Sequence, residues 1–486
     1  MEILNQSIVK KEARPVKVMQ FGEGNFLRGF VDYMLDIANE KKLFNGDIVL
    51  IKPIEYGNLD FFHQQDCLYT VSLRGLVDGE AQVLNRVVTS VAGAIDPYKE
   101  YDRYAQLAKS EDLRFVVSNT TEAGITYDES DRLELCPPKT YPGKLTKFLY
   151  ERYSHFHGDT AKGLIILPVE LIDDNGIILK QTVFKLAKHW GLEDAFTAWL
   201  AESCVFTSTL VDRIITGFPR DEAQKLWEDF GYQDNLIVTG EPFALWVIES
   251  EKEIEAELPF AAAGLPVVFT DNQKPYKQRK VRILNGAHTS FVLAAYLAGK
   301  DYVLESMEDD QIREFMNKTI YDEIIPTLKL PREELAAFAE AVEVRFKNPY
   351  IKHALLSIAL NSVSKWKARC MPSFLDYVEK TGELPGHLTF SLAALMAFYT
   401  GSEIKEKALT GHRGEQTYQI LDDAEILDFF AKYSTGDIAE FVNKFLSNVT
   451  FWDQDLTKIS GLSQAITGYL TDIRTLGLRE AMKGLD

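Results

Sequence analysis

Val16-Lys17-Val18-Met19-Gln20-Phe21-Gly22-Glu23-Gly24-Asn25-Phe26-Leu27-Arg28-Gly29 is the stretch that decides the fold. Residues 16–20 predict a β-strand, and the apolar spacing from Phe30 to Ala38 predicts a helix. Between them, Gly22 permits a tight turn, and Gly24 lets backbone N–H groups approach a pyrophosphate at the helix N-terminus. The third glycine of a GxGxxG motif is replaced by Leu27, so a structural turn or another nucleotide-like ligand stays open. The candidate cofactor-binding residues here are Phe21, Gly22, Gly24, Asn25, Phe26 and Arg28.

The rest of the N-terminal half alternates short β-branched runs with helical patterns, which is typical of a parallel sheet with crossover helices. We expect strands at 16–20, 48–52, 114–118, 164–169, 205–207, 236–238 and 267–269. From about Lys280 onward, helical periodicity dominates. The sequence therefore predicts an α/β domain of Rossmann type over residues 1–275 and a mostly α-helical domain over residues 276–486.

Composition narrows the class of protein. A chain of 486 residues is longer than one hydrophobic core usually grows, and its net charge of -19 argues against a nucleic-acid binder. The four cysteines are far apart, which favours a reducing, cytoplasmic environment over a disulfide framework. The longest apolar runs, 291–298 and 392–399, are too short to cross a membrane and predict buried helices.

Two more positions are candidates for the cofactor site. The second strand ends in Lys52, which could attract the 2′-phosphate of NADP or be an ordinary solvated lysine, and the latter is favoured. A third strand ends in the small polar residues Asn119, Thr120, Thr121 and Glu122. Ligands of open parallel sheets bind at the carboxyl ends of strands, although a polar loop without chemical consequence is the alternative.

The predicted domain boundary carries Lys280, Asn285 and His288 at the start of a helix. At about 100° per residue, Asn285 lies about 140° and His288 about 80° from Lys280, so one face presents all three. A lysine amine can take a hydroxyl proton while a neutral imidazole and a carboxamide polarise the same oxygen. By pattern alone, such a set is more often a solvated or capping surface.

A second polar stripe is predicted further along the chain. Asn348 and Pro349 resemble the start of a long helix. Along that helix a polar residue recurs every fourth position, at His353, Ser357, Asn361, Lys365 and Arg369. By pattern alone, this is usually a solvated face.

Three ordered motifs together resemble the long-chain polyol dehydrogenases, the mannitol dehydrogenase family. They are Gly22-x-Gly24-x-Phe26-x-Arg28, Thr121-Glu122-x-Gly124 and Lys280-x4-Asn285-x2-His288, and they span much of the chain. The resemblance implies that Lys280 is the general acid/base, that Asn285 and His288 polarise the substrate oxygen, and that no metal takes part. It also implies a nicotinamide cofactor, with NAD preferred over NADP, and a monomer.

Within the family, residues 21–28 and 167–176 are similar to a branch that acts on sugar acids. Other branches have Cys-Asp-Asn where this chain has Val169-Glu170-Leu171, so a second carboxamide is missing at Leu171. Lys365 matches a lysine that contacts substrate hydroxyls in the polyol enzymes. Those enzymes have an aspartate and an arginine where this chain has His353 and Ser357. The resemblance therefore implies a small sugar acid as substrate, with Glu170, His353, Lys365 and Arg369 as candidate substrate-binding residues.

Other functions fit the residues less well. Ser362-Val363-Ser364-Lys365 and Lys380-Thr381-Gly382 resemble serine acylase motifs but lie too close together. His155 and His157 could bind a metal only if they lay on a strand, and their surroundings predict a loop. A non-catalytic dinucleotide sensor would need the glycine turn without the set formed by Lys280, Asn285 and His288.

Overall fold

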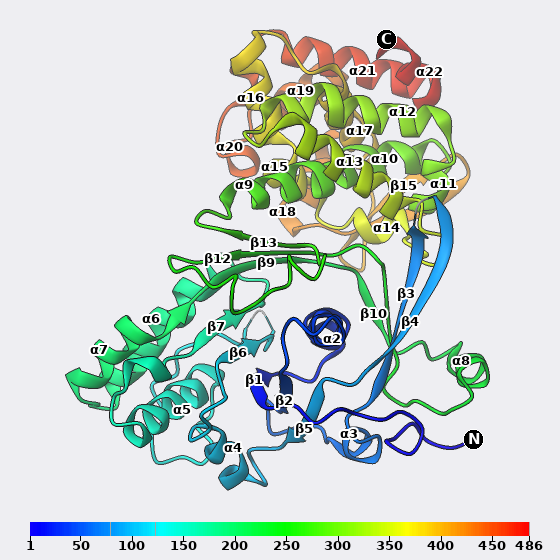
Figure 1. The fold of residues 1–486 in the computed structure, drawn as a ribbon. Helices are drawn as coiled ribbons and strands as arrows, with labels where there is room; N and C mark the ends of the chain where they lie inside the picture. The colour runs from blue at the N-terminus through cyan, green and yellow to red at the C-terminus, as the bar shows by residue number, and fades with distance from the viewer. Residues whose placement is uncertain (78, 122, 486) are drawn as a thin grey trace. The chain divides into compact units, whose positions relative to one another are not determined.

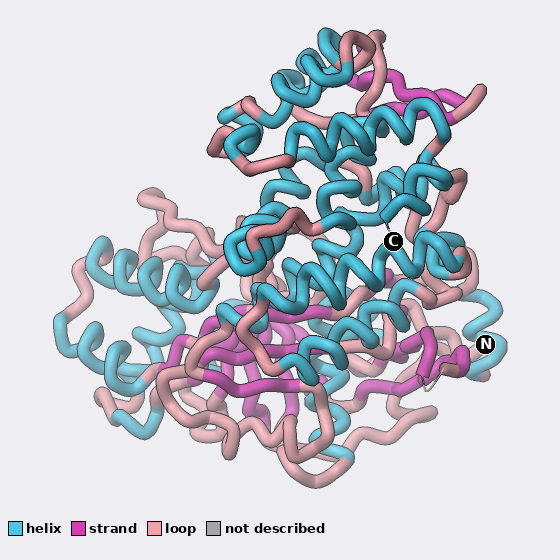
Figure 2. The backbone as a smooth tube through the Cα atoms, turned by 90° about the horizontal axis from the view of Figure 1, so that it is seen from above, coloured by secondary structure: helices cyan, strands magenta, loops and turns pink. Residues whose placement is uncertain are grey.

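The computed structural model describes residues 1–77, 79–121 and 123–485. The chain divides into two compact units, Met1–Gln273 and Lys274–Asp486, and each is described here by itself. The first unit combines strands and helices, and the second is mainly helical (Figures 1 and 2). The predicted combination of an α/β Rossmann-type domain with a helical domain is confirmed.

The centre of the first unit is a six-stranded sheet in the order β5-β2-β1-β6-β7-β8, and every neighbouring pair is parallel. Its strands are β1 (Val16–Phe21), β2 (Asp47–Ile51), β5 (Val91–Ile95), β6 (Phe115–Ser118), β7 (Ile165–Pro168) and β8 (Val205–Phe206). Phe21 pairs with Ile51 on one side and Ser118 on the other. The residues that follow β1, β2 and β6 therefore meet at one edge, where ligands of such sheets bind.

Both faces of this sheet are covered, because successive side chains of a strand point to opposite faces. Val18 belongs to a core that includes Phe30 and Leu35, whereas Met19 belongs to a second core with Phe148 and Leu179. The helices of the unit are α1 (Asn25–Leu27), α2 (Tyr33–Glu40), α3 (Asp60–Gln64), α4 (Tyr101–Leu107), α5 (Tyr141–His155), α6 (Asn175–His189), α7 (Asp194–Ser203) and α8 (Ala223–Phe230). Residues of α4 to α7 line the second core, which Figure 1 shows on the side of the sheet away from α2.

Two smaller sheets in this unit were not predicted as such. One has the order β10-β11-β3-β4 and the other β13-β12-β9. Their strands are β3 (Tyr69–Val77), β4 (Glu80–Val88), β9 (Ser208–Asp212), β10 (Ile215–Gly217), β11 (Val238–Gly240), β12 (Leu245–Glu249) and β13 (Val267–Thr270). Most of β4 is exposed or only partly buried, so the sequence lacks the apolar run that marked the central strands. The strand predicted at 236–238 lies two residues later, as β11.

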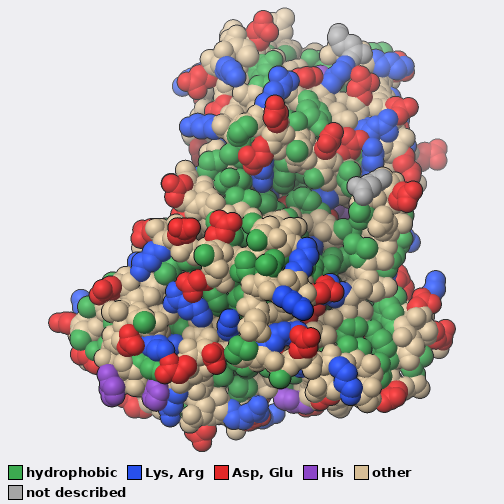
Figure 3. All heavy atoms as spheres, viewed as in Figure 1, with side chains coloured by type: hydrophobic (Ala, Val, Ile, Leu, Met, Phe, Trp, Pro, Cys, Tyr) green, Lys and Arg blue, Asp and Glu red, His purple; other side chains and the backbone are tan. Residues whose placement is uncertain are grey.

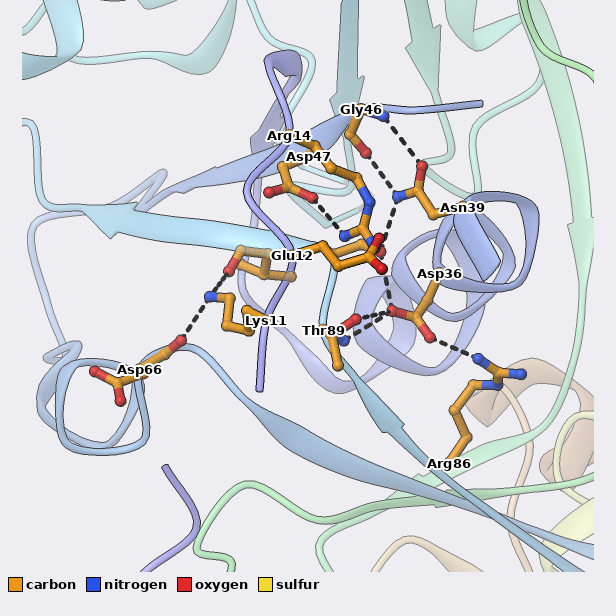
Figure 4. Close-up of polar contacts among 12 residues, drawn as sticks. Lys11, Glu12, Arg14, Asp36, Asn39, Gly46, Asp47, Asp66, Arg86 and Thr89 are labelled. Atoms are coloured by element: carbon orange, nitrogen blue, oxygen red, sulfur yellow. Dashed lines mark hydrogen bonds and ion pairs between the residues drawn. The ribbon is translucent and has the colours of Figure 1, made fainter. Parts of the chain in front are cut away.

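The segment before β1 is tied to the sheet by polar contacts (Figure 4). Arg14 forms an ion pair with Asp47 at the start of β2 at 3.2 Å, and Lys11 donates to the Asp66 carbonyl at 2.7 Å. On α2, Asp36 accepts from Thr89 and pairs with Arg86. These contacts fix both ends of the β1–α2–β2 unit that carries the glycine turn.

The second unit is built around α10 (Gly286–Leu297) and α17 (Gly386–Phe398), whose apolar residues are buried on all sides, as predicted from the runs 291–298 and 392–399. The other helices are α9 (Lys274–Arg279), α11 (Val303–Met307), α12 (Asp310–Lys318), α13 (Arg332–Phe346), α14 (Leu355–Ile358), α15 (Ser362–Arg369), α16 (Met371–Thr381), α18 (Ala424–Tyr433), α19 (Ile438–Leu446), α20 (Val449–Trp452), α21 (Leu462–Leu476) and α22 (Leu478–Met482). An unpredicted sheet contains β14 (Ile404–Lys405), β15 (Ala408–Arg413) and β16 (Gln416–Ile420).

The prediction of one long helix starting at Asn348 is wrong. Residues 347–354 contain no helix, and α14 and α15 are separated at Asn361, whose φ is +53°. A residue in this left-handed conformation cannot continue a right-handed helix. The Asn348 side chain accepts from the Tyr350 N–H at 3.0 Å, so it stabilises a turn.

Surface charge and helix length bear on what the protein can bind. Acidic and basic side chains are interspersed over the face shown in Figure 3. In the part of the chain that the structure describes, every helix is too short or too polar to cross a membrane.

Candidate active site

The glycine turn after β1 has the geometry that a bound pyrophosphate needs. Gly22 has φ of +118°, and a Cβ there would lie 3.0 Å from the Asn119 carbonyl oxygen, so only glycine fits without strain. A Cβ on Gly24 would meet nothing within 4 Å, which means that the space beside this residue is open. Gly24 is the N-cap of a helical run that continues from Asn25 to Glu40. The turn therefore presents unpaired backbone N–H groups beside open space.

Two residues that were predicted to bind the cofactor, Phe21 and Arg28, support this turn with buried side chains. Phe21 is fully buried, with its ring 4.9 Å from that of Tyr141, so its side chain is not available to a cofactor. Arg28 is 6% exposed, and it donates to the Glu23 carbonyl and to Asn25 Oδ1 at 3.1 and 2.7 Å. Both side chains contact protein atoms, and a role of Phe21 and Arg28 in binding the cofactor stays a prediction.

Lys52 is buried and forms an ion pair. Its side chain is 1% exposed, and its Nζ lies 2.6 Å from Asp96 Oδ2. The same Nζ donates to the carbonyls of Glu55 and Gly57 at 3.0 and 3.1 Å. The interpretation of Lys52 as an ordinary solvated lysine is therefore wrong, because its charge is paired with Asp96 in a buried site. Its contact with a cofactor stays a prediction.

The polar loop after β6 is held in place by a buried carboxylate. Glu170 is 2% exposed and accepts from Ser118 Oγ at 3.1 Å and from the Thr120 N–H and Oγ1, both at 3.0 Å. Burial raises the pKa of Glu170, and these hydrogen bonds oppose the shift. Glu170 therefore orders the loop, and its predicted contact with substrate stays a prediction.

The loop itself lies beside the glycine turn. The Asn119 N–H donates to the Phe21 carbonyl at 3.1 Å, which places Asn119 directly against the end of β1. Thr121 is exposed with φ of +81°, a strained conformation for a β-branched residue. Glu122 lies outside the described residues. Asn25, Phe26, Asn119, Thr120 and Thr121 stay candidates for cofactor contact.

In the second unit, Lys280 and Asn285 are the two ends of a π-helical segment, Lys280–Asn285, between α9 and α10. In a π-helix the hydrogen bond joins residue i to residue i+5, so each residue turns through a smaller angle than in an α-helix. Asn285 therefore lies closer to the side of Lys280 than the angle of about 140° expected for a regular α-helix. Short π-helical insertions occur frequently at functional sites.

His288 follows in the first turn of α10. Its Nε2 atom is buried and has no hydrogen-bond partner among the described residues. Burial lowers the pKa of the imidazole well below its ordinary value. The charges of Arg345, Arg369 and Lys365 and the neighbouring His353 lower it further. A neutral imidazole with a free ring nitrogen can donate to a substrate oxygen.

Lys365 and Arg369 form a positive pair on α15. Burial lowers the pKa of Lys365, and the charge of Arg369 lowers it further. Neither residue forms an ion pair with any described carboxylate, and Arg369 reaches Thr289 Oγ1 on α10 only at 3.4 Å. Their polar contacts include the Ile358 carbonyl, 3.0 Å from the Lys365 Nζ. The pair is therefore a place for an anionic group.

His353 reaches the same place from the loop before α14 and not from the predicted helix. Its ring centroid lies 5.3 Å from that of His288, at an interplanar angle of 78°. Ser357 is exposed and donates to the Ala354 carbonyl. The stripe of five residues is thus broken, but His353, Lys365 and Arg369 all act on His288.

The comparisons with known proteins agree over both units. Residues 16–261 match the mannitol dehydrogenase Rossmann domain, and residues 272–474 match the mannitol dehydrogenase C-terminal domain. The chain belongs to the mannitol dehydrogenase family. It is accordingly an oxidoreductase that acts on CH–OH groups, as the resemblance implied.

Proteins named altronate oxidoreductase are similar to this chain in sequence. Those from Yersinia enterocolitica and Escherichia coli are 46% identical over 492 residues, and at least 99% of each chain is covered. Among solved structures, a D-sorbitol dehydrogenase in substrate-free form has a TM-score of 0.79 at 21% identity, with 99% of this chain and 100% of that chain covered. A Pseudomonas fluorescens mannitol 2-dehydrogenase, in a ternary complex with NAD and D-mannitol, has a TM-score of 0.66 at 20% identity, with 100% and 99% covered. The two solved structures support the fold.

The sequence analysis did not predict two residues that lie beside His288, at the end of α13. Phe346 stacks on the His288 ring with a centroid distance of 4.1 Å, and Arg345 adds positive charge near it. Both are buried, and nothing in the pattern of α13 distinguishes them from core residues. Leu171, which replaces a carboxamide of other branches, is 67% exposed within its unit and offers no donor. Among the described residues, no group of three or more His, Cys, Asp or Glu could hold a metal ion.

Proposed function

We propose that this protein is an NAD(H)-dependent oxidoreductase that interconverts D-tagaturonate and D-altronate in hexuronate breakdown. Full-length relatives at 46% identity that carry the name altronate oxidoreductase support the substrate class. The structural observation that carries the proposal is the positive pair of Lys365 and Arg369 beside His288. A sugar acid supplies the carboxylate that such a pair would bind, whereas a neutral polyol does not.

The residues of the first unit fit a dinucleotide. The open space at Gly24 gives a pyrophosphate access to the backbone N–H groups at the start of the following helix. Asn25, Asn119, Thr120 and Thr121 would hold the rest of the cofactor near this edge of the sheet. When bound, the nicotinamide supplies or accepts the hydride at the carbinol carbon. Because Asp96 neutralises Lys52, that residue has no free charge for a 2′-phosphate, which favours NAD over NADP.

The residues of the second unit supply the proton and polarise the oxygen. In the reducing direction, the Lys280 ammonium donates its proton to the oxygen that becomes the altronate hydroxyl. In the oxidising direction, the neutral amine takes that proton back. The Asn285 carboxamide and the His288 imidazole donate hydrogen bonds to the same oxygen, which stabilises its negative charge in the transition state. This set needs no metal ion.

Lys365 and Arg369 would bind the carboxylate of the substrate, with His353 as a further contact. The chain as a whole carries -19, so an anionic substrate is repelled at long range. Binding must then depend on positive groups within about one Debye length, roughly 8 Å at physiological salt. The pair on α15 meets that requirement because Lys365 and Arg369 lie close enough for the charge of Arg369 to lower the pKa of Lys365, which the charge of Asp422 only partly opposes.

A substrate and cofactor screen tests the proposal. Purified protein is assayed with tagaturonate, fructuronate and fructose, each with NADH and with NADPH. We expect the highest kcat/KM for tagaturonate with NADH. Preference for fructuronate or fructose would assign the chain to another branch of the family, and the absence of turnover with all three would favour a non-catalytic dinucleotide sensor.

A further inference from the structure

The orientation of the His288 ring has an unusual physical basis. A catalytic histidine is ordinarily held by a hydrogen bond at the ring nitrogen opposite the working one, and that bond also fixes the tautomer. Among the residues that the structure describes, none hydrogen-bonds to either ring nitrogen of His288. Another interaction must therefore hold the plane of the imidazole.

Aromatic rings surround His288 in place of hydrogen-bond partners. The Phe346 ring lies parallel to the imidazole within 30°, with a centroid distance of 4.1 Å. His353 meets it edge-on at 5.3 Å, and Phe291 lies at 6.2 Å, one turn along the same helix. Of the three, only Phe346 is stacked face to face, and it comes from a different helix.

Phe346 is itself immobilised. It is the last residue of α13, is 6% exposed, and packs against Phe291 with a centroid distance of 5.9 Å. A buried ring that packs against Phe291 has few alternative rotamers, because protein interiors are close-packed. The imidazole can slide little against such a ring without losing contact.

We propose that Phe346 is a positioning residue for the reaction. Its ring holds the imidazole of His288 in the plane that directs the buried Nε2 toward the substrate oxygen. The same ring covers the imidazole from water, which favours the neutral form that can donate without being charged. This inference rests on the proposed role of His288 as a hydrogen-bond donor to that oxygen.

A purely structural role for Phe346 makes a different prediction. If the ring only filled the core, its loss would lower stability without a specific effect on the step that His288 assists. Phe390 is a suitable comparison, because it is fully buried in the same unit and packs against Phe315 and Tyr469, away from His288. Substituting either phenylalanine by leucine removes a buried ring, but only one of the two touches the proposed site.

The experiment compares Phe346→Leu, Phe346→Tyr, the control Phe390→Leu, His288→Ala and the double variant Phe346→Leu/His288→Ala. The kcat and KM are measured with the ketose acid that the wild type prefers, below the melting temperature of every variant. A displaced donor costs on the order of 10-fold to 10²-fold in rate, so Phe346→Leu should lose that much kcat with KM within about threefold. Phe346→Tyr, which keeps the ring, and Phe390→Leu should both stay within about threefold of wild type in kcat.

The double variant decides between the two roles. If Phe346 acts through His288, then adding Phe346→Leu to His288→Ala should cost nothing further in kcat. An equal additional loss in that background, or a Phe346→Leu variant with wild-type kcat, overturns the inference. If instead His288→Ala keeps full activity, it is the proposed role of His288 that fails, and the positioning role falls with it.

Discussion

Replacing Lys365 by methionine tests whether the pair on α15 recognises a carboxylate. Methionine keeps the length and apolar stem of lysine but removes the charge. A hydrogen bond to a charged group contributes about 1.5 to 3 kcal/mol. Lys365 is partly exposed, and solvent screening places its contribution near the lower end of that range, at about 1.5 kcal/mol. Since about 1.4 kcal/mol is a factor of ten, Lys365→Met should lose about tenfold more kcat/KM for tagaturonate than for the neutral ketose fructose.

The assay measures kcat/KM for both substrates in wild type, in Lys365→Met and in a control variant. Lys367→Met is the matched control, because Lys367 lies on the same helix but pairs with Asp453 at 2.7 Å. Lys367→Met should change kcat/KM by no more than about twofold for either substrate, as expected for the loss of an exposed ion pair. Equal losses for the acid and the neutral ketose in Lys365→Met, or a wild-type preference for fructose, would refute carboxylate recognition here. Lys365 would then contact hydroxyls, as the resemblance to the polyol enzymes implies.

Three further predictions concern the second unit. Lys280→Ala should retain NADH binding, measured by fluorescence, but lose on the order of 10² to 10⁴ in kcat, and near-normal turnover would reject the acid/base role. Turnover should survive exhaustive dialysis against a chelator, whereas loss of activity that zinc restores would contradict a metal-independent mechanism. Because burial lowers the folded-state pKa of His288, the unfolded chain binds protons more readily below about pH 6.5, so the free energy of unfolding should fall as pH decreases from 7 to 5. Urea unfolding should show a shallower fall in His288→Gln, and an unchanged slope would mean that His288 titrates normally.

Most strands of the central sheet could be predicted because they have a strong local signal, but β5 was not among the expected strands. Strands buried on both faces are nearly continuous apolar runs, and β1, β2, β6 and β7 all have this pattern. The strands β3 and β4 pair with each other over nine residues, but much of β4 faces solvent, so its residues lack that run. Pairing with β3, rather than an apolar run in its own sequence, stabilises β4 as a strand.

The motifs predicted which segments form the candidate site, but they did not predict the contacts between its residues. The ion pair between Lys52 and Asp96 joins residues at the ends of two neighbouring strands, and no local sequence pattern predicts it. Likewise, the left-handed residue Asn361 breaks a stripe that has perfect four-residue spacing. Phe346 and His288 are far apart in sequence, so only the packed structure shows that their rings stack.

The histidine at position 353, where the resemblance implies an aspartate in the polyol enzymes, links the geometry of the site to its proposed substrate. A carboxylate at position 353 would lie beside His288, where it would raise the pKa of the imidazole and offset the charges of Lys365 and Arg369. Burial instead lowers the pKa of His353, which favours its neutral form, so this residue does not offset those charges. A site with two cations binds a neutral polyol at a cost in desolvation, because the polyol returns no charge. A sugar acid returns that charge, so we expect the histidine at position 353 to favour the acid over the polyol.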